Sequence, residues 1–150
     1  MSVLTAILSF IFNLISGSQK SARKPVDPNY ESLRGEHYPP PYPNGWYNLC
    51  SADSLKKGQV KEVEAFGNRF AVFRGESGKV GVLDIFCPHL NANLADGRVE
   101  GDRLVCPFHG WEFRNNGTCA RIPYSENEPP AKAKTKSWTV KENWGLILMW

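Results

Sequence analysis

Cys87-Pro88-His89-Leu90 and Cys106-Pro107-Phe108-His109-Gly110-Trp111 are the two most informative stretches of this sequence. Each places a cysteine thiol and a histidine imidazole two or three positions apart. Sixteen residues separate His89 from Cys106, which is enough for a β-hairpin that brings the second stretch back beside the first. The sequence therefore predicts one site built from two loops, with four ligands: Cys87, His89, Cys106 and His109.

The types of these ligands indicate which metal they hold. Thiolates are soft anions that suit sulfide-bridged ferric iron, and neutral imidazoles suit the iron that takes up an electron. Replacing two thiolates by imidazoles makes such a cluster less negative, so it accepts an electron more readily. The donor set therefore predicts a [2Fe-2S] cluster. Structural zinc is the alternative, although zinc patterns usually start from a C-x2-4-C pair rather than from C-x-H followed by C-x-x-H.

The cysteines also indicate whether the chain is in an oxidising or a reducing compartment. Four cysteines could form two disulfides in a secreted protein, but two of them lie in the histidine-containing loops, and no secretory cleavage pattern is visible. This usage favours a metal in a reducing compartment. Cys50 and Cys119 lie outside both loops and are expected to be small buried hydrophobes. The third histidine, His37, is expected to be a surface residue of a Pro-rich segment.

Composition limits the remaining possibilities. The chain has 150 residues, 41% of them hydrophobic and 22% charged, as expected for one globular domain. The formal charge of +3 is far below the dense loading of Lys and Arg with which proteins bind nucleic acids, so nucleic acid is not an expected partner.

The hydrophobic pattern predicts a mostly β fold. Residues 46–150 are expected to form a domain of short antiparallel strands, and residues 20–45 a Pro-rich linker. The segment 74–79, Arg-Gly-Glu-Ser-Gly-Lys, is typical of a hairpin loop. The expected strands are 60–66, 70–74, 80–86, 103–105, 111–114 and 146–150.

Residues 1–19 are the one candidate membrane segment, because they carry no charged side chain. The run 3–17 would make a helix about 22 Å long, shorter than the roughly 30 Å hydrocarbon core. We predict a hydrophobic helix as a membrane anchor, which spans the bilayer with snorkelling or local thinning or lies in the interface; a signal peptide and a buried helix are the alternatives. Lys20, Arg23 and Lys24 favour a cytosolic location for the rest of the chain, at the endoplasmic reticulum.

The loop sequences resemble a known family. The stretches C-P-H-L-N-A-N-L-A-D-G (87–97) and C-P-F-H-G-W-E-F (106–113), with the opening Gly45-Trp46-Tyr47, resemble the Rieske domain of Rieske-type non-haem iron oxygenases over residues 45–150. Within that class the segments 71–84 and 121–124, and the hydrophobic N-terminus, are similar to the cholesterol 7-desaturase (Neverland-type) branch.

Three positions separate the chain from respiratory Rieske proteins. Those proteins have a disulfide-forming cysteine in each ligand loop, where this sequence has Leu90 and Phe108. They also carry a hydroxyl residue after the His-Gly pair, where this sequence has Trp111. A hydroxyl donor to cluster sulfide stabilises the reduced state, so its absence implies the lower potential of the oxygenase type.

The resemblance implies several partners. It implies an NAD(P)H-dependent flavin or ferredoxin-type reductase that supplies electrons, a sterol substrate, and a neighbouring subunit of a homo-oligomer. It also implies a second domain in which a mononuclear Fe(II) is held by two histidines and a carboxylate. All three histidines of this chain are already assigned, so we expect that iron, and catalytic completeness, outside these 150 residues. The alternative is a free-standing Rieske ferredoxin that only carries electrons.

Overall fold

The computed structural model describes residues 42–150, so the expected membrane segment 1–19 and most of the expected linker 20–45 lie outside the described residues. Within residues 42–150 no helix is long and apolar enough to cross a membrane. The elements are strands β1 (Tyr47–Ser51), β2 (Gln59–Ala65), β3 (Asn68–Arg74), β4 (Val80–Asp84), β5 (Arg98–Glu100), β6 (Arg103–Val105), β7 (Glu112–Phe113), β8 (Cys119–Arg121), β9 (Val140–Asn143) and β10 (Leu146–Met149), and the short 3-10 helices η1 (Ala52–Ser54) and η2 (Leu94–Asp96).

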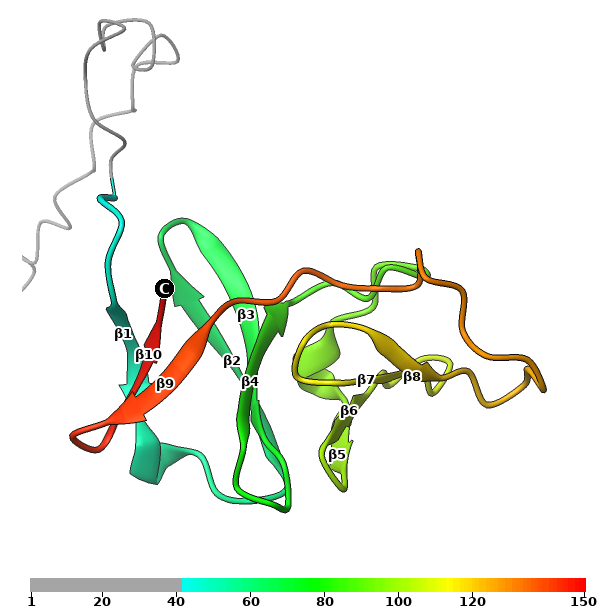
Figure 1. Cartoon of the computed structure of the whole chain (residues 1–150), viewed down its shortest axis with the longest axis horizontal. Coiled ribbons are helices and arrows are strands. Elements are labelled where there is room, and N and C mark those ends of the chain that lie inside the picture. Colours follow the sequence, from blue (N-terminus) through cyan, green and yellow to red (C-terminus); the bar gives the residue numbers. More distant parts are fainter. Residues whose placement is uncertain (1–41) are drawn as a thin grey trace, which may run out of the picture. The chain divides into compact units, whose positions relative to one another are not determined.

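The described strands form three antiparallel sheets (Figure 1). The sheet orders are β1-β10-β9, β2-β3-β4 and β5-β6-β7-β8. The loop of residues 74–79 joins β3 to β4, which confirms the predicted hairpin. A second hairpin, β5 and β6, fills the interval between His89 and Cys106 and returns the second ligand loop to the first, as the spacing predicts.

Strand β3 lies between two hydrophobic cores, which explains why it is apolar on both faces. Successive side chains of a strand point to opposite sides. Ala71 and Phe73 accordingly pack in the core shared with the β5-β8 sheet, while Phe70 and Val72 pack in the core shared with β10. All four side chains are at most 2% exposed. Strand β3 is therefore buried on both faces, and its neighbour β4 leads into the first ligand loop.

The predicted mostly β domain of antiparallel strands is confirmed. Each of the six expected runs contains a strand. Four further strands were not predicted, and three of them are short and polar: Arg98–Glu100 (RVE), Cys119–Arg121 (CAR) and Val140–Asn143 (VKEN). Such segments show no sustained alternation of apolar and polar residues. They become strands because a neighbouring strand pairs with them.

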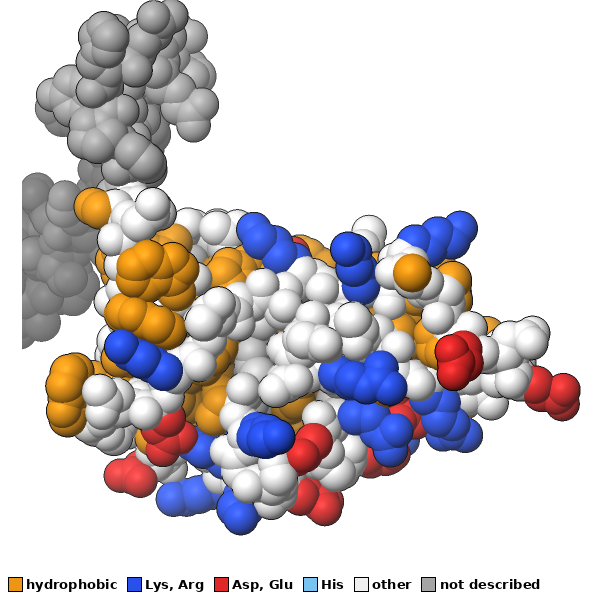
Figure 2. Space-filling model, viewed as in Figure 1, with side chains coloured by type: hydrophobic (Ala, Val, Ile, Leu, Met, Phe, Trp, Pro, Cys, Tyr) orange, Lys and Arg blue, Asp and Glu red, His pale blue; other side chains and the backbone are white. Residues whose placement is uncertain are grey.

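Exposed aromatic side chains gather at the end of the domain formed by β1, β9 and β10 (Figure 2). Trp46 and Trp150 make an edge-to-face pair with ring centroids 5.5 Å apart. The ammonium group of Lys141 lies 4.1 Å from the Trp46 ring centroid, in cation-π geometry. This end of the domain is built from β1, β9 and β10, whereas the ligand loops adjoin β4 and the β5-β8 sheet (Figure 1).

Candidate iron-sulfur site

The two ligand loops leave adjacent parts of the same core. The first loop follows β4 and runs through η2 to β5, and the second loop joins β6 to β7. A bridge between Phe86 and Asn93 closes the first loop, and the backbone amide of Leu94 donates to the Ile85 carbonyl. Because these anchor points are backbone contacts next to a buried core, the loops hold their shape without relying on exposed side chains.

The loops have the same backbone design. In the first, the amide of Cys87 donates to the carbonyl of Ala92 and the amide of Asn91 donates back to Cys87, each at 2.9 Å. In the second, the amide of Cys106 donates to Trp111 at 2.8 Å and the amide of Gly110 donates back to Cys106 at 3.1 Å. Each cysteine therefore begins a turn closed four and five residues later.

A left-handed residue closes each turn. Asn91 has a φ of 55° and Gly110 a φ of 69°, and these are the residue types that tolerate this conformation best. Gly110 is needed for a second reason: a Cβ there would lie 3.1 Å from Cγ of Pro123. The asparagine and the glycine are the sequence signals that fix the two loop shapes.

The four predicted ligands converge from these loops. The rings of His89 and His109 lie with their centroids 4.7 Å apart and their planes at 63°. Cys87 and Cys106 are 1% and 2% exposed, and their thiols adjoin each other in the core. The cysteines thus form a buried pair and the histidines a half-buried pair nearer the surface, which is the two-and-two arrangement of a Rieske cluster.

The residues present fit a metal cluster on an independent observation. Nδ1 of His89 is buried and has no hydrogen-bond partner, which is costly for a polar atom unless it binds something. The backbone amides of His89 and Leu90 donate to the sulfur of Cys87, and such donors favour a thiolate. An imidazole nitrogen and a sulfur are thus prepared at one site to bind a cation.

Burial raises the pKa of the Cys87 thiol well above its ordinary value, and the neighbouring sulfur of Cys106 raises it further. Two thiolates side by side in an apolar environment would repel each other. The buried pair is therefore stable as thiolates only when positive charge is bound between them. Cys119 is also buried, and burial raises its pKa too, but it lies in β8, outside both loops.

Among residues 42–150, no three His, Cys, Asp or Glu side chains are placed to bind a single metal ion. All four cysteines have free thiols in the structure. Cys119 is 7% exposed, which confirms its predicted burial, whereas Cys50 is only partly buried.

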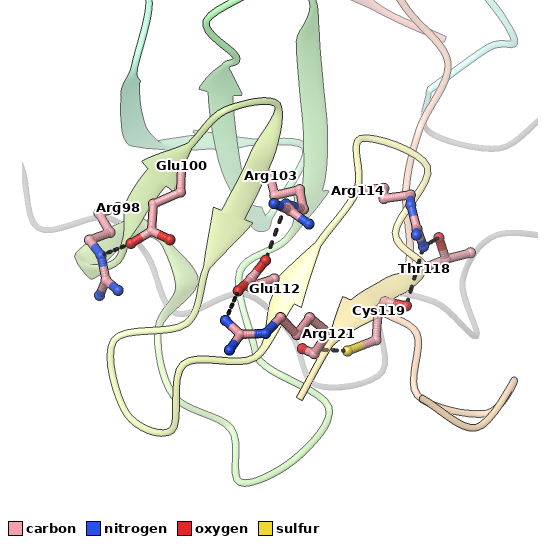
Figure 3. Close-up of polar contacts among 8 residues, drawn as sticks. All are labelled: Arg98, Glu100, Arg103, Glu112, Arg114, Thr118, Cys119 and Arg121. Atoms are coloured by element: carbon pink, nitrogen blue, oxygen red, sulfur yellow. Dashed lines mark hydrogen bonds and ion pairs between the residues drawn. The ribbon is translucent and has the colours of Figure 1, made fainter. Parts of the chain in front are cut away.

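A buried carboxylate holds together the sheet that carries the second loop (Figure 3). The side chain of Glu112, 3% exposed, lies 2.9 Å from Nη1 of Arg121 and 3.1 Å from Nε of Arg103. The contact with Arg103 is an ion pair without hydrogen-bond alignment. The three residues come from β7, β8 and β6, so one carboxylate joins three strands directly below the ligand loop. Sequence reasoning missed it, because a glutamate between Trp111 and Phe113 is expected to face solvent.

We expect Glu112→Gln to lower the free energy of unfolding of the metal-free chain by about 1–2 kcal/mol. Breaking a fully buried ion pair costs about 3–5 kcal/mol, but here both arginines are half exposed and regain water. Urea denaturation of Glu112→Gln beside Glu100→Gln measures the difference. Glu100 makes an exposed pair with Arg98, so that change should cost less than about 0.5 kcal/mol. Equal losses in the two variants would contradict the role of Glu112.

Two cysteine-histidine loops on a small antiparallel β domain define a Rieske-type iron-sulfur domain. The chain belongs to this family: the model of the Rieske [2Fe-2S] domain matches residues 45–139.

The most similar curated relatives act on steroids according to their names. The chain is 51% identical over 117 residues to a cholesterol 7-desaturase of Ciona intestinalis, covering 77% of this chain and 25% of that protein. It is 43% identical over 112 residues to a probable 3-ketosteroid-9-alpha-monooxygenase oxygenase component of Rhodococcus rhodochrous, covering 75% of this chain and 28% of that protein. The chain thus spans about a quarter of the length of these relatives.

A solved structure of dicamba monooxygenase has the same fold over this region. It superimposes with a TM-score of 0.64 at 32% identity, covering 71% of this chain and 34% of that chain. The resemblance read from the ligand loops to Rieske oxygenases, and to cholesterol 7-desaturases among them, is confirmed.

Proposed function

We propose that this chain is the electron-transfer part of a sterol-oxidising Rieske oxygenase or desaturase, with Cys87, His89, Cys106 and His109 as the ligands of its cluster. The single observation that supports the proposal is the pair of matching turns, each begun by a buried cysteine; the rings of His89 and His109 lie 4.7 Å apart, and Nδ1 of His89 is buried without a partner. When bound, a Rieske cluster accepts and releases one electron at a time.

The protein side chains have distinct roles in this proposal. Cys87 and Cys106 would hold one iron of the cluster, and their burial would keep water from it. His89 and His109 would hold the other iron, and their partly exposed rings would give electrons the shortest route to the surface. Phe86, Leu90 and Phe108 surround that route with exposed apolar side chains, 46%, 59% and 63% exposed.

Identity to cholesterol 7-desaturases supports a sterol as the substrate of the whole enzyme. Those relatives are about four times as long as the matched region, which leaves room for the domain that binds a mononuclear Fe(II). In that arrangement this chain passes electrons onward and does not itself touch the sterol.

The chain loaded with its cluster should therefore accept electrons yet leave added sterol unchanged. Sterol turnover by these residues alone would overturn the proposal that this chain only transfers electrons.

We propose that electrons arrive from a flavin or ferredoxin-type reductase with an acidic surface, which docks at Lys132 and Lys134 of the basic segment 132–141. Lys132 and Lys134 are exposed, and their segment lies along β8, in the sheet of the second ligand loop. Lys136 and Lys141 instead lie over the Trp138 and Trp46 rings.

Lys132→Glu and Lys134→Glu are therefore expected to slow reduction by the reductase several-fold at low salt, because basic groups steer an acidic partner. Stopped-flow absorbance of the cluster measures the rate. Lys141→Glu, the same charge reversal on β9, is the control and should change the rate less. A rate insensitive both to salt and to these changes would show that the patch is ordinary surface.

We also propose that residues 1–19 hold the chain on the membrane of the endoplasmic reticulum, with the cluster domain in the cytosol. The segment contains ten apolar residues that would each contribute on the order of 1 kcal/mol when buried in lipid. Fractionation of cells expressing the chain with and without residues 1–19 tests this: the full chain should sediment with membranes and the truncated chain should not. Full-length chain found soluble, or in the lumen with disulfides, would reject the anchor.

A further inference from the structure

His89, as a proposed metal-binding histidine, needs a contact that orients its ring. Such histidines almost always donate their second ring N-H to a carboxylate, a backbone carbonyl or water, and this bond sets the ring orientation. Among residues 42–150, the side chain of His89 makes no hydrogen bond to any protein group, and its Nδ1 is buried without a partner. Within residues 42–150, one packing contact is placed to hold the ring.

That contact is Trp111. Its indole ring lies flat against the His89 ring, with centroids 4.6 Å apart and planes within 6° of parallel. The centroid of the indole also lies 6.4 Å from the ring centroid of Phe113, a core residue that is fully buried. Trp111 belongs to the second ligand loop and His89 to the first, so the stack fixes a ligand of one loop from the other.

Tyr124 holds the indole in place. Nε1 of Trp111 donates a 2.6 Å hydrogen bond to the Tyr124 hydroxyl, which fixes the rotation of the indole about its bond to the chain. The segment of Tyr124 is itself seated on the second loop, because Pro123 packs against Gly110. Tyr124 is 64% exposed and so contributes little to the core. Its contact with Trp111 is nevertheless a directed hydrogen bond to the second ligand loop.

We propose that Trp111 is the positioning residue of His89, through the stack of the two rings, and that Tyr124 acts through Trp111. This inference rests on the proposed function, since it takes His89 as a cluster ligand. A ring held flat can keep Nδ1 directed inward while leaving its outer edge open to an electron partner.

The first test uses the metal-free full-length chain. The indole N-H signal of Trp111 is the one of five tryptophan signals that Trp111→Phe removes from the NMR spectrum. Tyr124→Phe should shift that signal and leave the other four in place. An unmoved signal would overturn the contact between Trp111 and Tyr124, whether or not the chain binds iron.

The second test uses the iron-loaded chain and measures the electron paramagnetic resonance of the reduced cluster and its rate of loss to a chelator. Trp111→Leu should broaden the resonance and speed cluster loss about tenfold or more, since both the stack and the hydrogen bond are removed. Trp144→Leu is the matched control, because Trp144 is 85% exposed in the turn between β9 and β10. Equal behaviour of the two leucine variants would overturn the inference.

Conservative variants separate positioning from general stability. Tyr124→Phe should speed cluster loss about fivefold, the factor expected for one hydrogen bond. In the Trp111→Phe background the same change should have no further effect, because the donor is already gone. Additive effects would overturn the role of Tyr124. A wild-type chain that binds no iron at all would overturn the proposed function together with the inference, and the NMR result would still show whether the contact exists.

Discussion

Cys87→Ala and Cys106→Ala each abolish assembly of the iron-sulfur cluster: this is the largest effect that we expect. Sulfide-bridged iron needs the anionic thiolate, and each iron of the cluster has only two protein ligands. The iron held by the two cysteines would lose half of its protein ligands in either variant, and the other cysteine of that core, Cys119, lies in β8, outside both ligand loops. The purified variants should lack the visible absorbance of the cluster and contain less than about a tenth of the wild-type iron.

Cys119→Ala is the matched control. Cys119 is 7% exposed and packs in the same hydrophobic core, but its thiol contacts the carbonyl of Arg121 rather than the ligand loops (Figure 3). This variant should assemble the cluster in full. Cluster in either loop variant, or its loss in Cys119→Ala alone, would show that the ligands have been assigned to the wrong cysteines.

His89→Cys and His109→Cys are each expected to lower the reduction potential by about 100 mV or more. A thiolate adds a negative charge to the iron that takes up the electron, so reduction becomes less favourable. Clusters with two histidine ligands have potentials of about −150 to +300 mV, against about −400 mV for plant-type clusters with four cysteines. Redox titration followed by absorbance measures the midpoint in each variant.

His37→Cys controls for the presence of an added thiol, because His37 lies outside both ligand loops in the sequence. Its midpoint should match that of the wild type. A midpoint that stays within about 30 mV of wild type in both His89→Cys and His109→Cys would contradict histidine ligation. Loss of the cluster in one variant still leaves the other to decide the question.

The sequence alone predicted two cysteine-histidine loops and six of the ten described strands. The spacing of Cys87, His89, Cys106 and His109 is local information, and the hairpin between the loops is expected from its length. The short strands β5, β8 and β9 could not be predicted, because polar segments of three or four residues become strands only when a neighbour pairs with them.

The side-chain contacts around the ligands could not be predicted from the sequence either. Glu112 is buried because it forms ion pairs with arginines of the two adjacent strands. No local sequence pattern predicts these pairs. The stack of Trp111 on His89 likewise depends on how closely two loops approach, which is set by the sheets below them. The one sequence signal for this stack was the tryptophan directly after the His-Gly pair, Trp111. The sequence did not show that its ring packs on His89.

Metal and sulfide analysis of the purified chain, reconstituted anaerobically with iron and sulfide, tests the central claim most directly. Two buried thiols and two imidazoles complete the outer coordination of a Rieske cluster, so the chain should contain two irons and two labile sulfides and be red-brown. Its reduced form should give the electron paramagnetic resonance of a cluster with mixed nitrogen and sulfur ligands. A chain that binds stoichiometric zinc, with neither iron nor labile sulfide, would contradict the account.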